Sequence, residues 1–265
     1  MKIDKSNKTK KEILEHIRKN KEILIAQKKN ELKNSDNFII SGNQKKEVEK
    51  ELEKKNENAT EIEVTCVMNS CNYMDSNDDV HISGIWKKTI SENKRIFHLQ
   101  EHVNSFSNII ATPNNIIVKT ATILWKELGY DANGSTQVLI FVSKIKKSVN
   151  EKMFELYKSG IIDQHSVGMQ YVNIELAMDS NEDEDEFFVW NKYIDSIVNK
   201  EKAIKQGYFW AIKEAKLYEG SAVMNGSNPI TPTINIKTEP SQDTQQNKIT
   251  ASALSIENQI INFLN

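Results

Sequence analysis

Long apolar runs, cysteines and prolines are all scarce in this sequence of 265 residues. No run of about 18 apolar residues occurs, so we expect no membrane-spanning helix. The opening residues, MKIDKSNKTKKEILEH, have no apolar stretch behind their lysines, so we expect no secretory signal. The two cysteines, Cys66 and Cys71, are too few for a disulfide framework, and their C-x4-C spacing does not suit a zinc knuckle. Both are expected to be reduced thiols.

An overall excess of charge of one sign is also missing, because the formal net charge is only −2. The distribution is uneven. Residues 1–60 carry 16 Lys and Arg against 11 Asp and Glu, a balance of +5, and residues 61–265 carry 19 against 26, a balance of −7. A basic arm can bind nucleic acid, but here basic and acidic residues are interleaved. We therefore expect a solvated, charged helix rather than a nucleic-acid site.

The first 60 residues are predicted to form a helical arm outside the core. Residues 8–33 have a helical pattern, and residues 44–55 are a more polar stretch of the same kind. Asn, Ser and Gly at 34–43 separate the two pieces. The pattern predicts an exposed or partner-binding arm over 1–60. Its apolar positions in the first piece are Ile13, Leu14, Ile17, Leu24 and Ile25.

The compact domain is expected to begin near Glu61, where EIEVTCVM alternates polar and apolar residues as a strand does. The pattern of NEKMFELYKSG predicts a helix that ends before Gly160. The acidic run EDEDE at 182–186 is interpreted as a solvated loop, and residues 187–204 as a second helix. Further strands are predicted at 95–102, 115–125, 136–145, 166–178 and 208–224.

The composition changes after Asn228. The following segment is polar, contains three of the four prolines and lacks periodicity, which is typical of a linker. The last residues, ALSIENQIINFLN, can form a short amphipathic segment. The predicted organisation is therefore an arm at 1–60, a domain at 61–232, and a flexible linker with a terminal segment at 233–265. Strands and helices do not alternate regularly, so the fold class is α+β and not a doubly wound parallel sheet.

The segment HLQEH, from His98 to His102, matches the H-x-x-E-H pattern of inverted zinc proteases. That chemistry needs a helix, because only there do residues four apart point toward one zinc ion. The flanking residues do not settle helix against strand, and no third ligand can be picked out. A zinc peptidase is therefore one alternative.

Serine hydrolysis needs a hydroxyl, a neighbouring base and a third group that orients the base. The motif G-x-S-x-G is absent, because residues 164–168 read QHSVG, which argues against an α/β-hydrolase. Ser166 differs from other serines by position, since it follows a helix and opens an apolar strand. Gly168 is expected on the same face as Ser166, where it leaves space beside the hydroxyl.

Four blocks in a fixed order carry a resemblance to a known family. They are DDVHISGIWKKTISENKRI at 78–96, HLQEHVNSFSNIIA at 98–111, LYKSGIIDQHSVGMQYV at 156–172 and AKLYEGSAVMNGSNPITP at 215–232. In this order the chain resembles the prohead proteases of tailed phages, which are similar in fold and active site to herpesvirus assemblins. The resemblance covers about residues 61–232 and neither end of the chain.

The resemblance implies an assemblin-like β-barrel or sheet core with flanking helices, to which the sequence patterns at the two ends add the helical N-terminal arm and a disordered C-terminal tail. It implies a Ser-His-Glu triad in which Ser166 is the nucleophile, His102 the base and Glu219 the third member. Residue 103 is Val where the family often has Asp, so His98 is the reserve choice for the base. No metal or organic cofactor is implied.

The resemblance also implies a substrate and a location. The substrate is the scaffolding segment of the major capsid protein, and the protease's own ends are a further hypothesis. The protein is expected to self-associate inside the assembling prohead in the host cytoplasm, with no membrane and no nucleic-acid partner. The chief alternative is a non-catalytic capsid-assembly or scaffolding protein that keeps the protease fold.

Overall fold

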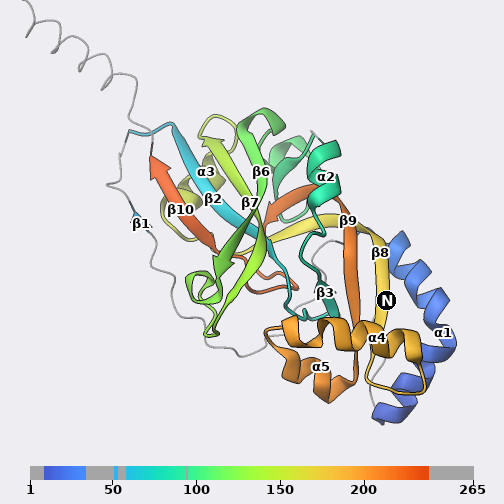
Figure 1. The fold of residues 1–265 in the computed structure, drawn as a ribbon. Coiled ribbons are helices and arrows are strands. Elements are labelled where there is room, and N and C mark those ends of the chain that lie inside the picture. Colours follow the sequence, from blue (N-terminus) through green and yellow to red (C-terminus); the bar gives the residue numbers. More distant parts are fainter. Residues whose placement is uncertain (1–8, 34–50, 53–57, 94, 239–265) are drawn as a thin grey trace, which may run out of the picture.

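A computed structural model describes residues 9–33, 51–52, 58–93 and 95–238. It is a mixed α+β fold, as the sequence pattern predicts, and its strands form two sheets. Figure 1 shows the two long strands β8 and β9 running from the region of the first sheet toward α1, α4 and α5. Within the ranges given above, no helix is both long enough and apolar enough to cross a membrane.

The first sheet forms because its strands alternate between a buried and a wetter face. In β2, Ile62, Val64 and Cys66 are fully buried, whereas Glu63 and Thr65 between them are half-buried. The order of its strands is β1-β10-β2-β7-β6. They are β1 (Glu51–Leu52), β2 (Glu61–Ser70), β6 (Ile116–Leu124), β7 (Ser135–Lys146) and β10 (Thr233–Thr238).

The second sheet is organised around β9, which pairs antiparallel with β8 along nearly its whole length. Two short strands pair with the other side of β9, both parallel to it. Strand β3 pairs with the first half of β9, and β4 pairs with its last residues. Strand β5 pairs with β4 and ends the sheet. The strands are β3 (Asp79–His81), β4 (Phe97–Gln100), β5 (Ile109–Ala111), β8 (His165–Met178) and β9 (Tyr208–Ala222).

The two sheets do not close into a barrel, so the barrel form of the expected core is wrong and the open-sheet form holds. The physical reason lies in the edges. Among the strands of the described residues, β8 forms a ladder only with β9 and β6 only with β7, so each sheet keeps a strand with one side outside any ladder.

Helices flank the sheets at both ends of the molecule. Helix α3 begins at the cap Asn150, whose side chain accepts from the Met153 N–H, and the chain leaves it through Gly160 at a φ of 77°. The predicted helix is therefore confirmed. The helices are α1 (Lys10–Asn30), α2 (Lys87–Glu92), α3 (Glu151–Lys158), α4 (Glu184–Tyr193) and α5 (Lys200–Gln206). Short 3-10 turns occupy Phe106–Asn108, Pro113–Asn115, Trp125–Leu128 and Ile194–Ser196.

Helix α1 exists where the sequence predicts it, but it is not an exposed arm. It starts with a capping box between Thr9 and Glu12 and lies beside β8 (Figure 1). Ile17 and Leu24 are buried and belong to the main hydrophobic core. The expectation of an arm outside the core is wrong because a narrow apolar stripe is enough to dock the helix when its charged side chains also form ion pairs with the rest of the protein.

Those partners are the acidic residues predicted as a solvated loop. Asp183 precedes α4, and the next three acidic residues form the first turn of that helix, where negative charge is favourable. The Asp183 carboxylate accepts two hydrogen bonds of 2.6 Å from the Arg18 guanidinium. Lys21 pairs with Glu186 at 2.5 Å. The acidic run is therefore a docking surface for α1 and not a free loop.

The expected domain limit at residue 232 is also corrected. Strand β10 follows it directly and pairs antiparallel with β2, so the first sheet uses residues from the predicted linker. Glu51 and Leu52, expected to be helical, form the short parallel strand β1 beside β10. The rest of the predicted helix at 44–55 and the amphipathic terminal segment lie outside the described residues.

The main core lies between β2, β7, β8 and β9, with α1 and α3 packed against it. Trp86 and Trp210 are its largest fully buried side chains. The free thiols Cys66 and Cys71 are buried, the first within β2 as expected. Burial raises the pKa of Cys71 to about 12, which leaves this thiol unreactive.

Candidate active site

The fold brings Ser166, Glu219 and His102 from three neighbouring segments to one face of the second sheet. Glu219 lies on β9, Ser166 on β8 to one side, and His102 two residues beyond the end of β4 on the other side. The β8–β9 register places Ser166 opposite Ser221 and Gly168 opposite Glu219. Residues opposite each other, or two apart, share a face of an antiparallel pair. The three residues therefore face the same side.

His102 and Glu219 form a closed pair. The distance from His102 Nδ1 to Glu219 Oε1 is 2.6 Å, and the side chains are only 5% and 13% exposed. A carboxylate only accepts, so the shared proton sits on Nδ1. In the neutral ring this leaves Nε2 as an unprotonated acceptor, the arrangement a general base needs. Nε2 is buried and has no hydrogen-bond partner among the described residues.

Gly168 is required by the position of the Glu219 carboxylate. A Cβ atom at residue 168 would lie 2.1 Å from Glu219 Oε1 and 2.9 Å from its Cδ. The space that the sequence predicts beside Ser166 is therefore occupied by the third member of the site. This close approach explains why QHSVG carries a glycine two residues after the serine.

Ser221 binds both members of the His102–Glu219 pair, and the sequence analysis did not identify it. Its hydroxyl donates to Glu219 Oε2 at 2.6 Å and accepts from the main-chain N–H of His102 at 3.1 Å. It thus holds both the carboxylate and the backbone of the histidine. A local signal exists, because Glu219 and Ser221 are two residues apart on a strand and must share a face. Ser221 is fully buried, so it orients the site rather than meeting a substrate.

The backbone at the histidine is strained. Glu101 and His102 have φ values of 53° and 58°, in the left-handed region that costs non-glycine residues energy. The turn is fixed by the Glu101 N–H donating to Ala222 O at 2.9 Å and the Val103 N–H donating to Gln100 O at 3.0 Å. Two consecutive left-handed residues aim the imidazole back over the sheet, toward Glu219.

Ser166 is half-buried and is held through its neighbour, His165. Because His102 Nε2 has no partner, the Ser166 hydroxyl is not hydrogen-bonded to it in this conformation. His165 is fixed on all sides. Its N–H donates to Thr231 Oγ1 at 3.2 Å, its ring Nδ1 lies 2.9 Å from Thr231 O, and Nε2 lies 3.0 Å from the Tyr157 hydroxyl.

A proton arrangement follows from the Thr231 carbonyl. Since this oxygen only accepts, His165 carries its proton on Nδ1, and its Nε2 accepts from Tyr157. Tyr157 has one hydroxyl proton, so its contact of 3.1 Å with His98 Nε2 requires a proton on His98. His98 Nδ1 then accepts from Ser143 at 3.0 Å. Both histidines therefore belong to one buried chain of hydrogen bonds that reaches β8 at His165.

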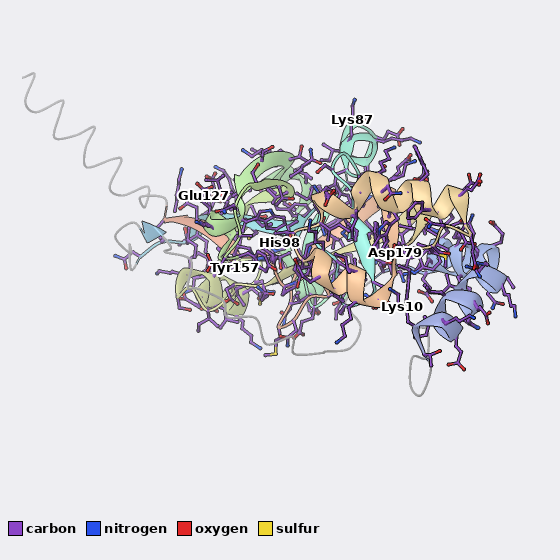
Figure 2. The ribbon with its side chains drawn as sticks, turned by 60° about the horizontal axis from the view of Figure 1, so that its bottom comes forward. Lys10, Lys87, His98, Glu127, Tyr157 and Asp179 are labelled. Carbon is purple, nitrogen blue, oxygen red and sulfur yellow. The ribbon has the colours of Figure 1, made fainter. Side chains whose placement is uncertain are left out.

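The H-x-x-E-H alternative loses its structural basis. His98 lies on strand β4 and His102 in the turn after it, so the segment is not a helix. His98 is fully buried, both its nitrogens are engaged, and burial holds its pKa well below the usual value. It cannot serve as the reserve base. Figure 2 shows His98 and Tyr157 within the sheet region, away from Lys10 and Asp179 at the α1 end. Across the described ranges, no three His, Cys, Asp or Glu side chains form a group that could hold a metal ion.

A small hollow adjoins Ser166 at the edge of β8. Its wall includes Lys33, Met68, Val167, Met169, Asn228 and Thr231. Behind it lies a buried polar cluster. Lys28 of α1 pairs with Asp79, and the Tyr171 hydroxyl donates to the same carboxylate at 2.8 Å.

Burial shifts the pKa values of two side chains in this cluster. Burial lowers the pKa of His81, which lies 3.3 Å from the Tyr171 hydroxyl, to about 4. Burial, with the negative charge of Asp79 added, raises the pKa of Asp75 to about 7. The polar groups behind the hollow therefore already have partners within the protein.

Comparisons with protein-family models, with curated proteins and with solved structures find no match for this chain. What the site can do rests on its own chemistry. It offers an imidazole oriented by a carboxylate, with one free nitrogen, on the same face as a serine of the neighbouring strand.

Proposed function

We propose that the protein is a serine endopeptidase in which Ser166 is the nucleophile, His102 the base and Glu219 the orienting acid. The observation that carries this proposal is the 2.6 Å His102–Glu219 pair with Nε2 left free, on the face that Ser166 shares. The glycine opposite Glu219 and the strained turn at His102 support it, because the first makes room for the carboxylate and the second directs the imidazole toward it.

The reaction begins when Ser166 Oγ attacks the scissile carbonyl carbon and His102 Nε2 takes the hydroxyl proton. Glu219 stabilises the resulting imidazolium and keeps its Nδ1 proton in place. The tetrahedral intermediate collapses as His102 gives the proton to the leaving amine, and an acyl-enzyme remains. Water then attacks the ester with the same histidine as base, which restores Ser166.

This chemistry requires the Ser166 hydroxyl to come within about 3 Å of His102 Nε2. The present conformation lacks that hydrogen bond. Such bonds are often long before substrate binds, and a rotation of the Ser166 side chain brings its oxygen to another position on the same face. The proposal therefore includes closure of this contact on substrate binding.

The substrate follows from the resemblance of the four sequence blocks. We propose that the enzyme cuts the scaffolding segment of a capsid protein during prohead maturation, inside the assembling particle in the host cytoplasm. The residues that carry the catalytic roles in that family fall on the three residues that this fold brings to one face. The reaction needs no metal and no organic cofactor.

The second candidate is a non-catalytic capsid-assembly protein with the same fold. One observation favours it: His102 Nε2 is shielded from solvent and is not bonded to Ser166. A non-catalytic protein would have no need of the His102–Glu219 pair, however. Here Ser221, Gly168 and the strained turn all hold this pair in place.

The test is co-expression with the major capsid protein of the same virus, read by intact mass. Wild type is compared with Ser166→Ala and with Ser91→Ala, an exposed serine on α2 that serves as the matched control. We expect trimmed capsid protein with wild type and Ser91→Ala only. Uncut capsid protein in all three cultures supports the assembly role, and equal cutting in all three removes Ser166 from the mechanism.

A further inference from the structure

The outer edge of β6 is long and regular. This strand lies beside β7 at one end of the first sheet (Figure 1), and its nine residues pair with β7 without a bulge. Other strands at the ends of the sheets are much shorter, since β1 has two residues and β5 has three. Within the described part of the chain, no strand or isolated bridge pairs with the outer side of β6. An open edge of this length is a template for a further strand.

One hydrogen bond fixes which residues of β6 direct their main-chain groups outward. The Trp125 N–H, one residue beyond β6, donates to Gly134 O at 3.1 Å on the β7 side. The register with β7 has no shift, and the direction alternates along an antiparallel ladder. The odd-numbered residues of β6 therefore bond to β7, and the even-numbered residues direct both N–H and C=O outward. These outward residues are Ile116, Val118, Thr120, Thr122 and Leu124.

The sequence of β6, IIVKTATIL, is close to symmetric about Thr120, with apolar residues at both ends and polar residues near the centre. A second copy of the strand, related by a two-fold axis at Thr120, runs antiparallel to the first. Because Thr120 is itself an outward residue, every outward residue then meets an outward residue, and donors face acceptors along the whole edge. The pairs are Ile116 with Leu124, Ile117 with Ile123, Val118 with Thr122, Lys119 with Ala121, and Thr120 with itself.

This pairing covers the two large apolar side chains that β6 exposes. Ile117 is 63% exposed and Leu124 is 51% exposed. In the two-fold arrangement, Ile117 lies against Ile123 of the second copy, a residue that packs on the hydrophobic cluster around Trp125. Leu124 lies against Ile116 of the second copy, which packs on the main core. Each exposed side chain thus extends a core that the other copy already has.

The polar residues of β6 also suit a second copy. Lys119 is the one charged residue of the strand, and it faces Ala121 and not the other lysine. Its side chain is exposed, so its charge stays in water. Thr120 faces Thr120, a cross-strand pair whose hydroxyl groups can hydrogen-bond. The strand has no proline and no bulge, two features that keep natural edge strands apart.

We infer that the outer edge of β6 binds the same edge of a second copy of this chain, antiparallel about Thr120, so that the first sheets of two copies join into one. The inference goes beyond the proposed function and does not depend on it. The candidate active site lies on the second sheet, so its residues take no part in this contact.

The register is tested by a disulfide at the two-fold axis. Thr120→Cys and Thr122→Cys are compared in the full chain, whose own Cys66 and Cys71 are buried and do not compete. Residue 120 faces itself with about 5.5 Å between Cα atoms, which a disulfide spans. The two copies of residue 122 lie four positions apart along the ladder, about 13 Å, which is too far.

Both proteins are oxidised with copper phenanthroline and followed on non-reducing gels. We expect Thr120→Cys to form a covalent dimer at least tenfold faster than Thr122→Cys. Equal rates, or faster cross-linking through residue 122, would overturn the inference.

The strength of association is measured by sedimentation velocity over a range of concentrations. Thr120→Pro removes only an outward N–H, a position where an edge strand tolerates proline. Two central hydrogen bonds are lost in the dimer, so we expect dissociation to become about ten- to hundredfold easier. Ile117→Lys should also weaken the dimer at least tenfold. Ile161→Lys is the matched control, because Ile161 is 64% exposed but lies in the turn after α3, and its dimer should be unchanged.

Three results would overturn the inference. The first is a wild-type chain that stays monomeric at its highest soluble concentration. The second is a dimer that Thr120→Pro leaves equally strong, because that dimer would use another surface. The third is a monomer in which NMR shows the Thr120 and Thr122 amides protected from exchange, which would assign the edge to this chain's own residues 239–265. If Thr120→Pro does not fold, the cysteine pair decides, since both of its members keep the main-chain N–H.

Discussion

Gly168→Ala tests the geometry of the site with a single methyl group. The added Cβ would lie 2.1 Å from Glu219 Oε1, and ordinary contact begins near 3.4 Å, so the carboxylate must retreat by about 1.3 Å. Retreat away from the imidazole lengthens the 2.6 Å bond to His102 Nδ1 to about 3.9 Å, beyond hydrogen-bond range. The moving atoms are the end of a flexible side chain, so the fold should lose only about 1–3 kcal/mol. Loss of the orienting acid should lower kcat about 10³–10⁴-fold.

The matched control is Gly220→Ala, one residue from Glu219 on the opposite face of β9. Its Cβ would lie 2.6 Å from the Phe141 ring and 3.0 Å from Met68 Sδ, so it crowds the core and not the pair. Casein hydrolysis, thermal unfolding and the NMR signal of the His102 Nδ1 proton are measured for both variants. We expect lost activity and a lost hydrogen-bonded proton signal in Gly168→Ala, and a lower melting temperature with a retained signal in Gly220→Ala. A folded Gly168→Ala protein with wild-type activity would refute the reasoning.

Three further predictions concern stability. Burial lowers the pKa of His81 from the ordinary 6.5 to about 4. The stability that comes from burying the neutral ring is therefore fully present above pH 6.5 and is lost as the pH falls through 4. Urea unfolding should show the free energy of unfolding falling by up to about 1.4 kcal/mol per pH unit in this window, and His81→Gln should weaken that dependence on pH. Tyr157→Phe leaves the His98 Nε2 proton buried without an acceptor and should cost about 1–3 kcal/mol by chemical denaturation, whereas an unchanged midpoint would contradict the proton arrangement. Arg18→Ala should lower the free energy of unfolding by about 1 kcal/mol at low salt and by less at high salt. The reason is that salt screens the ion pair with Asp183, since the Arg18 side chain is 35% exposed. Equal loss at both salt concentrations would argue against an ionic role.

Much of the fold follows from local sequence patterns. The long strands and α3 were predictable because alternation and helical spacing act within one element. Long-range pairing was not. Residues 233–238 alternate polar residues with Ile234 and Ile236 but are short and follow two prolines, and they form β10 by pairing with the edge of β2. Helix α1 was placed correctly along the chain, but its docking depends on acidic partners more than 150 residues away, as at Arg18 and Asp183.

Sequence patterns and the family resemblance single out the three candidate residues, but the contacts that join them were not predictable. The face shared by Ser166 and Gly168 follows from strand periodicity, and the role of the glycine becomes visible only when β9 lies alongside. Ser221 carries a local signal, two residues after Glu219, that the sequence analysis left unused. The left-handed turn at His102 has little sequence signal, since histidine adopts that conformation more often than most residues but Glu101 does not favour it.

The central claim is that Ser166 is a nucleophile activated by His102 and Glu219. The most direct measurement is labelling of the purified full chain with a fluorophosphonate, followed by mass spectrometry of the modified peptide. The account predicts a single adduct on Ser166, absent in His102→Ala and slowed in Glu219→Gln. An adduct on another serine, or equal labelling of Ser166 without His102, would contradict it.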